Sequence, residues 1–470
     1  MSAPATTEKK YLKWYQKLAY GSGDLASNCS YGLVSSFVLL YLTGTLGLDS
    51  AIIGSLMLAS KVLDGISDVI FGTLIDRTHS KLGKARPWML FGQVGVSLCL
   101  FLLFAIPAGS TTMQYIYFFI VYTALNAVFY TANGIAYSSL VALITKNNNE
   151  RVQLGSFRFM FAVVTNIFMG FAVTGMVEKF GSGAAGWRTT ALIFAIVGLV
   201  VNTISCLAVK ELPEKELSDN TSEAAEEGKA VAEEKKHGFS ETAKILVNNK
   251  YYLMILAIYI VYYIMSNLTT GAGVFCATYY WGDGSLLGQF SMMKMFPVII
   301  ALAIAPVLIK KTGSMQKVNF WGYAISSVLG IPMIYFAMQK NLSMFLLFMF
   351  IKGIFAGTLS GSLNALIAEA SGYTTRTTGI HMDGMMYSCS SLGVKVGGGI
   401  GTAAVGWLLK LGGFVGTATV QSESAIRMIF NLYITFPFVI GIIITVLLAF
   451  LDVEKANKKW DAEHQKEAQA

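Results

Sequence analysis

The sequence predicts an all-α integral membrane protein with twelve transmembrane helices, built as two pseudo-symmetric bundles of six. Its 470 residues are 54% hydrophobic and only 13% charged, about half the charged share of an ordinary soluble domain. Mean hydropathy is +0.57. The apolar residues form long continuous runs, each near the roughly 20 residues that a helix needs to cross a bilayer. They do not alternate with polar residues as the strands of a membrane barrel do.

The predicted spans follow one another along the chain, separated mostly by short polar turns. They lie approximately at 18–46, 51–75, 88–108, 113–145, 153–177, 187–209, 251–281, 285–309, 318–338, 343–370, 379–410 and 426–451. The longest polar segment, rich in Glu, Lys and Ala, falls between the sixth and seventh runs, so we interpret it as a cytoplasmic linker that is partly helical. The predicted domains are a tail at 1–17, a bundle at 18–209, the linker at 210–250, a bundle at 251–451 and a tail at 452–470.

Basic residues set the expected orientation. Lys and Arg gather in the N-terminal tail and in the turns after the second, fourth and eighth runs, whereas the turns at 44–50, 107–112 and 281–285 have none. Because cytoplasmic loops carry the excess of Lys and Arg, both termini are predicted to be cytoplasmic, in a plasma membrane protein. A basic, glycine-containing turn follows both the second and the eighth run, which indicates an internal repeat.

The second run is unlike an ordinary membrane helix, because it contains Lys61, Asp64 and Asp68. At i, i+3 and i+7 these residues share one helix face. A charged side chain at the bilayer centre costs about 2.5–3.5 kcal/mol on the most lenient scale. Two carboxylates one turn apart also repel unless a positive charge lies between them. We therefore interpret this face as lining a polar cavity that binds a cation. The alternative is that Lys61 neutralises one aspartate in a buried packing pair.

Other predicted helices also contain polar residues within the apolar runs. Five of these charged residues supply both signs on separate helices: Asp24, Asp64, Asp68, Arg158 and Lys395. The fourth helix adds hydroxyls, an amide and aromatic faces from Tyr130, Thr131, Asn133 and Tyr137. This combination suits a polyhydroxylated ligand, since charged groups bind hydroxyls strongly and rings stack on the apolar faces of sugars.

Three more intramembrane charges, Lys294, Lys352 and Glu369, are interpreted as structural pairs or as gate contacts. His381 and Asp383 lie near a loop, where a solvated or gating role is expected.

Several function classes are not indicated. The sequence has no phosphate loop, HExxH, nucleophile motif or dinucleotide fingerprint, and its five Cys and four His residues are scattered. We therefore expect no enzyme activity, no cofactor and no nucleic-acid partner. The remaining energy source is an ion gradient, worth about 2.3 kcal/mol per charge per 100 mV.

Four motifs carry a family resemblance: YGSGDLASN, LDGISDVIFGTLIDRTHSKLGKARPW, the FR at Arg158, and GVKVGGG around Lys395. With them the chain resembles the glycoside–pentoside–hexuronide:cation symporters, the melibiose-permease-like branch of the major facilitator superfamily. The resemblance covers nearly the whole chain. It implies that Asp64 and Asp68 bind the coupling cation (Na⁺, if sodium is the ion), with Ser67 and Thr131 nearby. It also implies that Asp24 contacts the sugar, helped by Tyr130, Arg158 and Lys395.

The chain departs from the family pattern at two places near the expected sugar site. Gly23 stands where some members have a lysine, and the helix-four sugar ligand falls on Gly134, one step from Asn133. The sequence therefore predicts a monomeric sugar:cation symporter but leaves open the sugar, and the choice among Na⁺, Li⁺ and H⁺. The alternatives are a lysolipid:cation symporter and a sugar sensor that does not transport.

Overall fold

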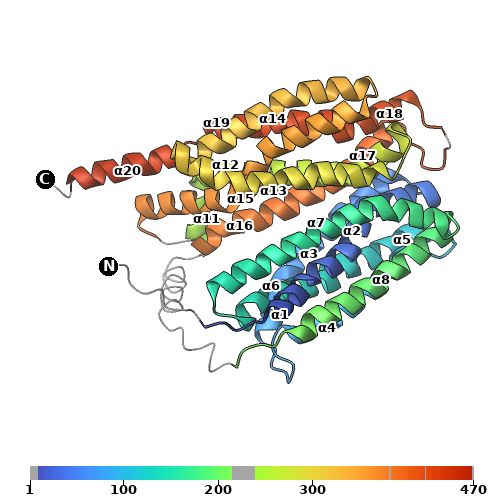
Figure 1. Cartoon of the computed structure of the whole chain (residues 1–470), viewed down its shortest axis with the longest axis horizontal. Helices are drawn as coiled ribbons and strands as arrows, with labels where there is room; N and C mark the ends of the chain where they lie inside the picture. The colour runs from blue at the N-terminus through green and yellow to red at the C-terminus, as the bar shows by residue number, and fades with distance from the viewer. Residues whose placement is uncertain (1–8, 214–238, 381–382, 419, 468–470) are drawn as a thin grey trace. The chain divides into compact units, whose positions relative to one another are not determined.

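The computed structural model describes residues 9–213, 239–380, 383–418 and 420–467. Most of the predicted linker and His381 therefore lie outside the described residues. Within them the chain is helical, without a strand. It divides into two compact units (Figure 1): unit 1 comprises Met1–Asp219, Gly273–Gln289 and Gly406–Ile426, and unit 2 comprises Asn220–Ala272, Phe290–Val405 and Arg427–Ala470. Two segments of the predicted second bundle thus pack with the first.

Unit 1 contains the helices of the first half of the chain. They are α1 (Trp14–Gly21), α2 (Gly23–Leu40), η1 (Tyr41–Thr45), α3 (Ser50–Asp76), α4 (Arg86–Leu103), α5 (Thr111–Thr123), η2 (Ala124–Tyr130), α6 (Thr131–Ile144), α7 (Asn148–Lys179) and α8 (Gly183–Ala208), with η3 (Cys276–Tyr280) from the second half. The η segments are single π-helical turns. Polar residues begin several helices: the side chains of Asp49, Ser110 and Asn147 each accept a backbone N–H of the helix that follows.

Unit 2 contains most of the second half. Its elements are α11 (Phe239–Asn248), α12 (Lys250–Phe275), α13 (Leu286–Thr312), α14 (Met315–Met338), α15 (Leu342–Thr378), α16 (Asp383–Leu392), η4 (Gly393–Gly397), α17 (Gly398–Leu411), α18 (Glu423–Phe430), η5 (Asn431–Thr435), α19 (Phe436–Phe450) and α20 (Val453–Glu467). The first residues of α13, the end of α17 and the start of α18 belong to unit 1.

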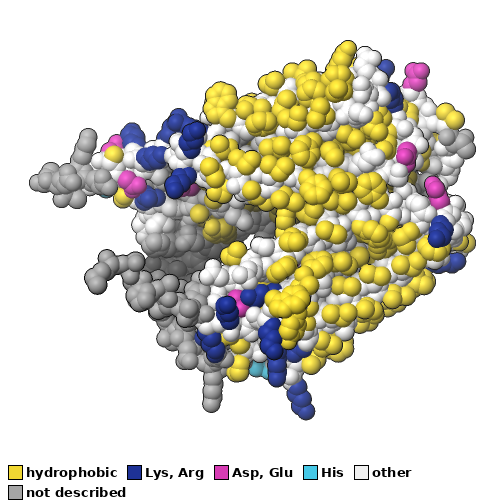
Figure 2. Space-filling model, in the orientation of Figure 1, with side chains coloured by type: hydrophobic (Ala, Val, Ile, Leu, Met, Phe, Trp, Pro, Cys, Tyr) yellow, Lys and Arg dark blue, Asp and Glu magenta, His cyan; other side chains and the backbone are white. Residues whose placement is uncertain are grey.

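The described helices agree with the predicted twelve crossings. Eleven helical stretches in the described residues are long and apolar enough to span a membrane. The predicted second span, α3, is not among them; its 27 residues are long enough to cross, but they include Lys61, Asp64 and Asp68. On the face shown in Figure 2, hydrophobic side chains cover the lengths of the helices and Lys and Arg gather toward their ends. This is the surface of a multi-pass membrane protein.

A glutamate has the same structural role in each half. Glu211, which follows α8, accepts three backbone N–H groups at and just before the start of α4, at 2.7–3.0 Å. Glu454, which follows α19, accepts the Ser314 hydroxyl and the backbone N–H of Gln316 at the start of α14. In both halves a carboxylate after the sixth helix caps the N-terminus of the third, where the helix dipole favours negative charge. The matched caps support an internal repeat.

The end of α17 contacts the start of α3 within unit 1. Lys410 Nζ lies 2.6 Å from Asp49 Oδ2, and the Ser50 hydroxyl donates to the Gly406 carbonyl at 2.9 Å. Burial acts to raise the pKa of Asp49, but the hydrogen bond from Lys410 and two backbone N–H donors outweigh it. The pKa of this carboxyl therefore lies below its ordinary value, and the pair stays charged at neutral pH.

Reversing one charge of this pair tests the contact. In Lys410→Asp two carboxylates face each other, so we expect a lower thermal midpoint, and Asp49→Asn/Lys410→Asp, which removes the repulsion but keeps a capping side chain at the start of α3, should recover most of the loss. The effect should be small, because the Lys410 side chain is 59% exposed. The depressed pKa means that the wild-type pair contributes above the ordinary carboxyl pKa of about 4, and the contribution disappears as pH falls through the lowered value. A double variant as unstable as Lys410→Asp alone would contradict the pairing.

Candidate functional site

One face of α2 carries a row of polar side chains. Asp24, Asn28 and Tyr31 lie at i, i+4 and i+7, so they point to the same side of the helix, and all three are partly exposed. The Asn28 amide donates to the Asp24 backbone carbonyl at 2.7 Å. Asn166 of α7 donates to the Asn28 side-chain oxygen at 2.9 Å. This polar row connects the two charge clusters described next.

The first cluster is built around an ion pair between α2 and α7. Arg158 Nε lies 2.6 Å from Asp24 Oδ2, with the side chains 25% and 18% exposed. The guanidinium also lies over the Tyr137 ring, 4.1 Å from its centroid. The Tyr137 hydroxyl in turn donates to the Tyr20 carbonyl at 2.8 Å, which holds the ring in place. Asp24, Tyr137 and Arg158, predicted from the sequence, thus lie together. They offer acceptors and donors that are still open to a ligand.

The second cluster is built around Asp64 of α3. The Thr131 hydroxyl donates to Asp64 Oδ1 at 2.6 Å, and Lys61 Nζ lies 3.6 Å from Asp64 Oδ2. Asp68 lies one turn further along α3 and is also partly exposed. The Lys61 and Asp64 side chains are 16% and 13% exposed, so the pair is neither sealed in the core nor fully in solvent. Lys61 does contact an aspartate, as the packing alternative requires.

Aromatic rings join the two clusters. Lys61 Nζ lies 5.4 Å from the centroid of the Tyr31 ring, and Tyr31 is stacked on Tyr130 with centroids 5.1 Å apart. Tyr31 stands on α2 two turns after Asp24. Lys61 therefore contacts a ring that stands on the same face of α2 as Asp24.

Three predicted site residues border or lie within π-helical turns. Tyr130 is the last residue of η2 and Thr131 the first of α6. The Thr131 hydroxyl lies 2.8 Å from the carbonyl of Asn126, five residues earlier, as well as near Asp64. Lys395 lies at the centre of η4 in unit 2, partly exposed. Such turns occur often at functional sites, and apolar periodicity does not reveal them.

Asn133 lies outside the clusters, although we predicted it to bind substrate. It is 2% exposed, and its amide donates to the Met89 carbonyl of α4 at 2.7 Å. Asn202 of α8 donates to the same carbonyl at 3.0 Å. Asn133 therefore joins α6 to its neighbouring helices. The adjacent Gly134 faces open space instead: a Cβ at this position would have no atom within 4 Å.

Replacing Asn133 tests this correction. We expect Asn133→Ala to destabilise the protein by about 1 kcal/mol, because it removes a buried hydrogen bond while Met89 keeps its second donor. Sugar affinity should stay within a factor of about two of wild type, as no ligand-facing group is lost. Thermal unfolding and sugar titration of the purified variant measure the two effects. A large loss of affinity without loss of stability would restore Asn133 to the binding set.

Ser67 is near the acidic residues but bound to its own helix. Its hydroxyl donates to the Asp64 backbone carbonyl at 2.9 Å. The lone pairs of the hydroxyl oxygen are therefore what Ser67 can still offer to a cation.

Asn166 was missed by the sequence reasoning. It lies on α7 eight residues after Arg158, two turns along the same face, so this spacing was the available signal.

The acidic cluster is suited to a small monovalent ion. Among the described residues, no three His, Cys, Asp or Glu side chains are grouped as a metal site would require. The donors near Asp64 and Asp68 are carboxylate, hydroxyl and carbonyl oxygens, the ligands preferred by hard cations. The residues present therefore fit Na⁺, Li⁺ or a proton, each as a transported ion.

Charged residues that face one another between membrane-spanning helices are typical of secondary transporters. Residues 19–455 match the family described as MFS/sugar transport protein, so the chain belongs to this family of secondary transporters. It is 26% identical to the isoprimeverose transporter of Lactiplantibacillus pentosus over 478 aligned positions, covering 100% of this chain and 96% of that protein. It is 24% identical to a putative glycoside/cation symporter of Escherichia coli (strain K12), covering 95% and 93%.

A solved structure shares the fold. The bacterial homologue of the human lysosomal transporter Spinster, in an inward-facing and unoccupied conformation, aligns with a TM-score of 0.66. The alignment covers 95% of this chain and 97% of that one at 13% identity, so it bears on the fold alone.

Proposed function

We propose that this protein is a carrier, not an enzyme, and that it symports a sugar with a monovalent cation. The observation that supports this most is the proximity of two charge clusters in unit 1. Asp24 and Arg158 form one cluster, and Asp64 with Lys61 and Thr131 forms the other. The stacked pair Tyr31 and Tyr130 lies between them. The name of the glycoside/cation symporter relative supports the same assignment.

The cation site is proposed to work by competition with Lys61. Without a bound ion, Lys61 and Thr131 compensate Asp64. A cation held by Asp64 and Asp68 replaces the ammonium, and Thr131 can turn its lone pairs toward the ion. The displaced Lys61 changes its contact with Tyr31, which borders the sugar site. Linkage then requires the sugar to raise cation affinity by the same factor.

The proposed sugar site contains Asp24, Tyr130, Tyr137 and Arg158 of unit 1, and a sugar contact for Lys395 stays a prediction from the sequence. Asn28 and Asn166 take the place of Asn133 as the proposed amide ligands, since Asn28 belongs to the polar row on α2 and Asn166 of α7 donates to it. Carboxylate and guanidinium bind sugar hydroxyls, and the rings stack on the sugar faces. Loading of both solutes would permit alternation of access between the two sides of the membrane, and the cation alone would not.

Counterflow in proteoliposomes tests the proposal. Vesicles loaded with one unlabelled sugar from a panel should take up the same labelled sugar, and the rate should rise when Na⁺, Li⁺ or a lower pH supplies the coupling ion. Competition by lysolipids instead of glycosides would indicate a lysolipid symporter, and ligand binding without flux would indicate a sensor.

We also propose a monomer in the plasma membrane with both termini cytoplasmic, which terminal tags and protease protection in oriented vesicles would test.

A further inference from the structure

Unit 2 contains a pocket that lies between its own helices. The volume of the pocket is about 180 Å³, enough for a small ion together with several water molecules. Its lining comes from α12, α13, α14, α15, η5 and α19, and every lining residue belongs to unit 2. Methionine and aromatic side chains form much of the wall, and hydroxyl groups come from Ser266, Thr269, Ser326 and Ser327. The proposed symport does not use this pocket.

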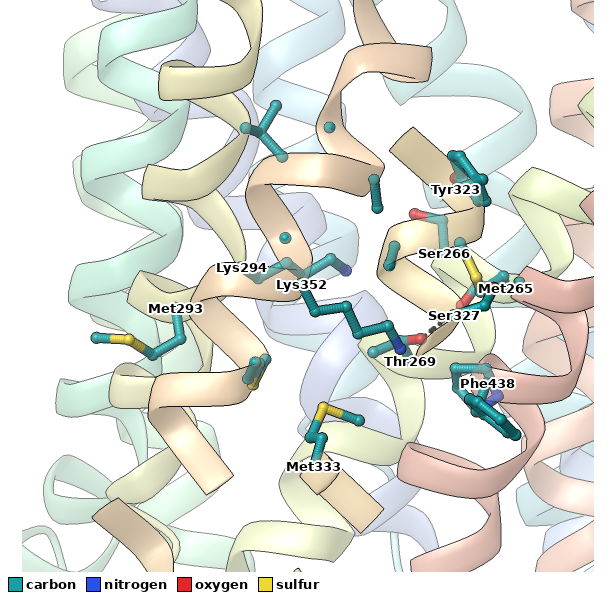
Figure 3. A pocket seen from close by; sticks show the side chains of 18 of the residues that line it. Met265, Ser266, Thr269, Met293, Lys294, Tyr323, Ser327, Met333, Lys352 and Phe438 are labelled. Atoms are coloured by element: carbon teal, nitrogen blue, oxygen red, sulfur yellow. Dashed lines mark hydrogen bonds between the residues drawn. The ribbon is translucent and has the colours of Figure 1, made fainter. Parts of the chain in front are cut away.

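Two lysines extend into this pocket from neighbouring helices. Lys294 of α13 and Lys352 of α15 both line it, and Figure 3 shows their side chains directed into the same space. They are the ninth residue of α13 and the eleventh of α15, so each lies about 12–15 Å from the start of its helix. Close packing keeps the two helices together here, because a Cβ on Gly353 would lie 2.8 Å from Cβ of Pro297. Both ammonium groups are therefore held within the membrane-spanning part of unit 2.

The described residues provide no acidic partner for either lysine. Neither takes part in an ion pair there, and Lys294 donates to the Thr270 hydroxyl at 3.2 Å. Glu369 is the single acidic residue in the sequences of α12, α13, α14, α15 and α19. It lies about 25 Å beyond Lys352 along α15 and accepts a hydrogen bond from Asn457. Of the two roles expected for these lysines, a structural ion pair is thus not found among the described residues.

Two uncompensated ammonium groups are unfavourable in this position. Each costs about 2.5–3.5 kcal/mol at the centre of a bilayer, and like charges repel each other. An anion between them would offset both effects, because charge-assisted hydrogen bonds are strong where the dielectric constant is low. Such an anion would also join α13 to α15.

The chemistry of the lining favours an oxyanion. A lysine ammonium has three donors and no acceptor, and serine and threonine hydroxyls can donate as well. None of the described residues that line the pocket is Asp or Glu, so a metal cation would have no carboxylate ligand there. A phosphate group carries about one to two negative charges at neutral pH and several acceptor oxygens. These properties match two ammonium groups with hydroxyls beside them.

We propose that Lys294 and Lys352 form a binding site for a phosphate group within unit 2. The group belongs either to inorganic phosphate or to the headgroup of an anionic phospholipid, since both present the acceptor oxygens that the lysines need. The bound phosphate is a ligand that holds α13 to α15 and is not a transported solute. The site therefore goes beyond the proposed symport, and all of its residues belong to one unit.

Titration with inorganic phosphate tests for a free anion. The purified protein is placed in nanodiscs of phosphatidylcholine, a zwitterionic lipid, and phosphate or chloride is added as the potassium salt at equal ionic strength. We expect calorimetry to show binding of phosphate to the wild type, and the thermal midpoint to rise with phosphate concentration. Chloride should have a much smaller effect. The result does not depend on the proposed symport, because no sugar, Na⁺ or Li⁺ is added.

Variants show whether any binding occurs at the two lysines. Lys294→Met and Lys352→Met keep an unbranched side chain among the methionines of the pocket but remove the ammonium. Each should weaken phosphate binding about tenfold or more. Lys294→Arg and Lys352→Arg keep a cationic donor and should keep most of the affinity. Lys311 is an exposed lysine at the end of α13, and the control variant Lys311→Gln should bind phosphate as the wild type does.

A second preparation identifies the source of the phosphate group. In nanodiscs of phosphatidylglycerol without added phosphate, a bound lipid headgroup should raise the midpoint of the wild type above its value in phosphatidylcholine, and the methionine variants should lose this rise. A lysine-dependent response to dissolved phosphate assigns the site to the free anion. A lysine-dependent response to phosphatidylglycerol alone assigns it to the lipid. Either response supports a phosphate site.

Three outcomes would overturn the inference. Neither preparation could show a lysine-dependent response, or chloride could act as strongly as phosphate, which would indicate screening of charge alone. The third is a methionine variant that is less stable than the wild type in phosphatidylcholine without added phosphate. Removing an uncompensated buried charge should leave the midpoint unchanged or raise it, so a lower midpoint would assign the lysine to the packing of unit 2.

Discussion

Replacement of Asp64 by asparagine should abolish sugar accumulation against a gradient. The amide keeps the size of the side chain and its bond to Thr131, but it removes the charge that holds the cation. At a membrane potential of 100 mV one coupled charge supplies about 2.3 kcal/mol, so accumulation should fall roughly 50-fold, to equilibrium. Sugar exchange without a gradient should partly survive, because Asp24 and Arg158 are unchanged. Uptake of labelled sugar by energised vesicles, with exchange measured in the same preparation, gives both quantities.

Two further variants show whether loss of accumulation in Asp64→Asn is specific to the cation site. Asp68→Asn should behave like Asp64→Asn if both carboxylates hold the ion. Glu178 is an exposed acid near the end of α7, and the control variant Glu178→Gln should accumulate sugar as the wild type does. Equal accumulation by Asp64→Asn and wild type would reject the cation site. Loss of both accumulation and exchange would assign Asp64 to folding or to the sugar instead.

The sequence predicted the fold well because membrane helices are governed by a simple rule. Long apolar runs must become helices in a bilayer, so the order of the spans, and every span except the charged second one, follow from hydropathy. The division of the chain into two units does not follow from hydropathy. Packing assigns the segments around 273–289 and 406–426 to the first unit, and contacts such as Ser50 with Gly406 do not follow from any local pattern.

The candidate site was predictable only in part. A charge in an apolar run can be found in the sequence, so Asp24, Asp64 and Arg158 were found. A neutral amide is less conspicuous, and Asn133 and Asn166 look alike until their partners are known. One binds a backbone carbonyl in the core and the other a side chain of the polar row. Whether a lysine is paired also depends on packing, so the sequence left open whether Lys294 and Lys352 are structural pairs or gate contacts.

Replacement of Asp24 by alanine should weaken sugar binding by roughly 10- to 100-fold, the effect of losing about 1.5–3 kcal/mol of charge-assisted hydrogen bonding. Titration of sugar at a saturating concentration of the coupling cation measures the loss. Cation affinity in the absence of sugar should change little, because Asp64 and Asp68 remain. The variant also leaves Arg158 without its carboxylate partner, so its thermal midpoint should fall as well.

The double variant Asp24→Ala/Arg158→Ala separates sugar contact from simple neutralisation of Arg158. If Asp24 acts only by compensating the guanidinium, the double variant should bind sugar as well as Arg158→Ala alone, as in a thermodynamic cycle for two coupled residues. If Asp24 accepts hydrogen bonds from the sugar, the double variant should bind sugar more weakly than Arg158→Ala, while its thermal midpoint lies above that of Asp24→Ala. Equal sugar affinity of the double variant and Arg158→Ala would therefore remove Asp24 from the sugar site.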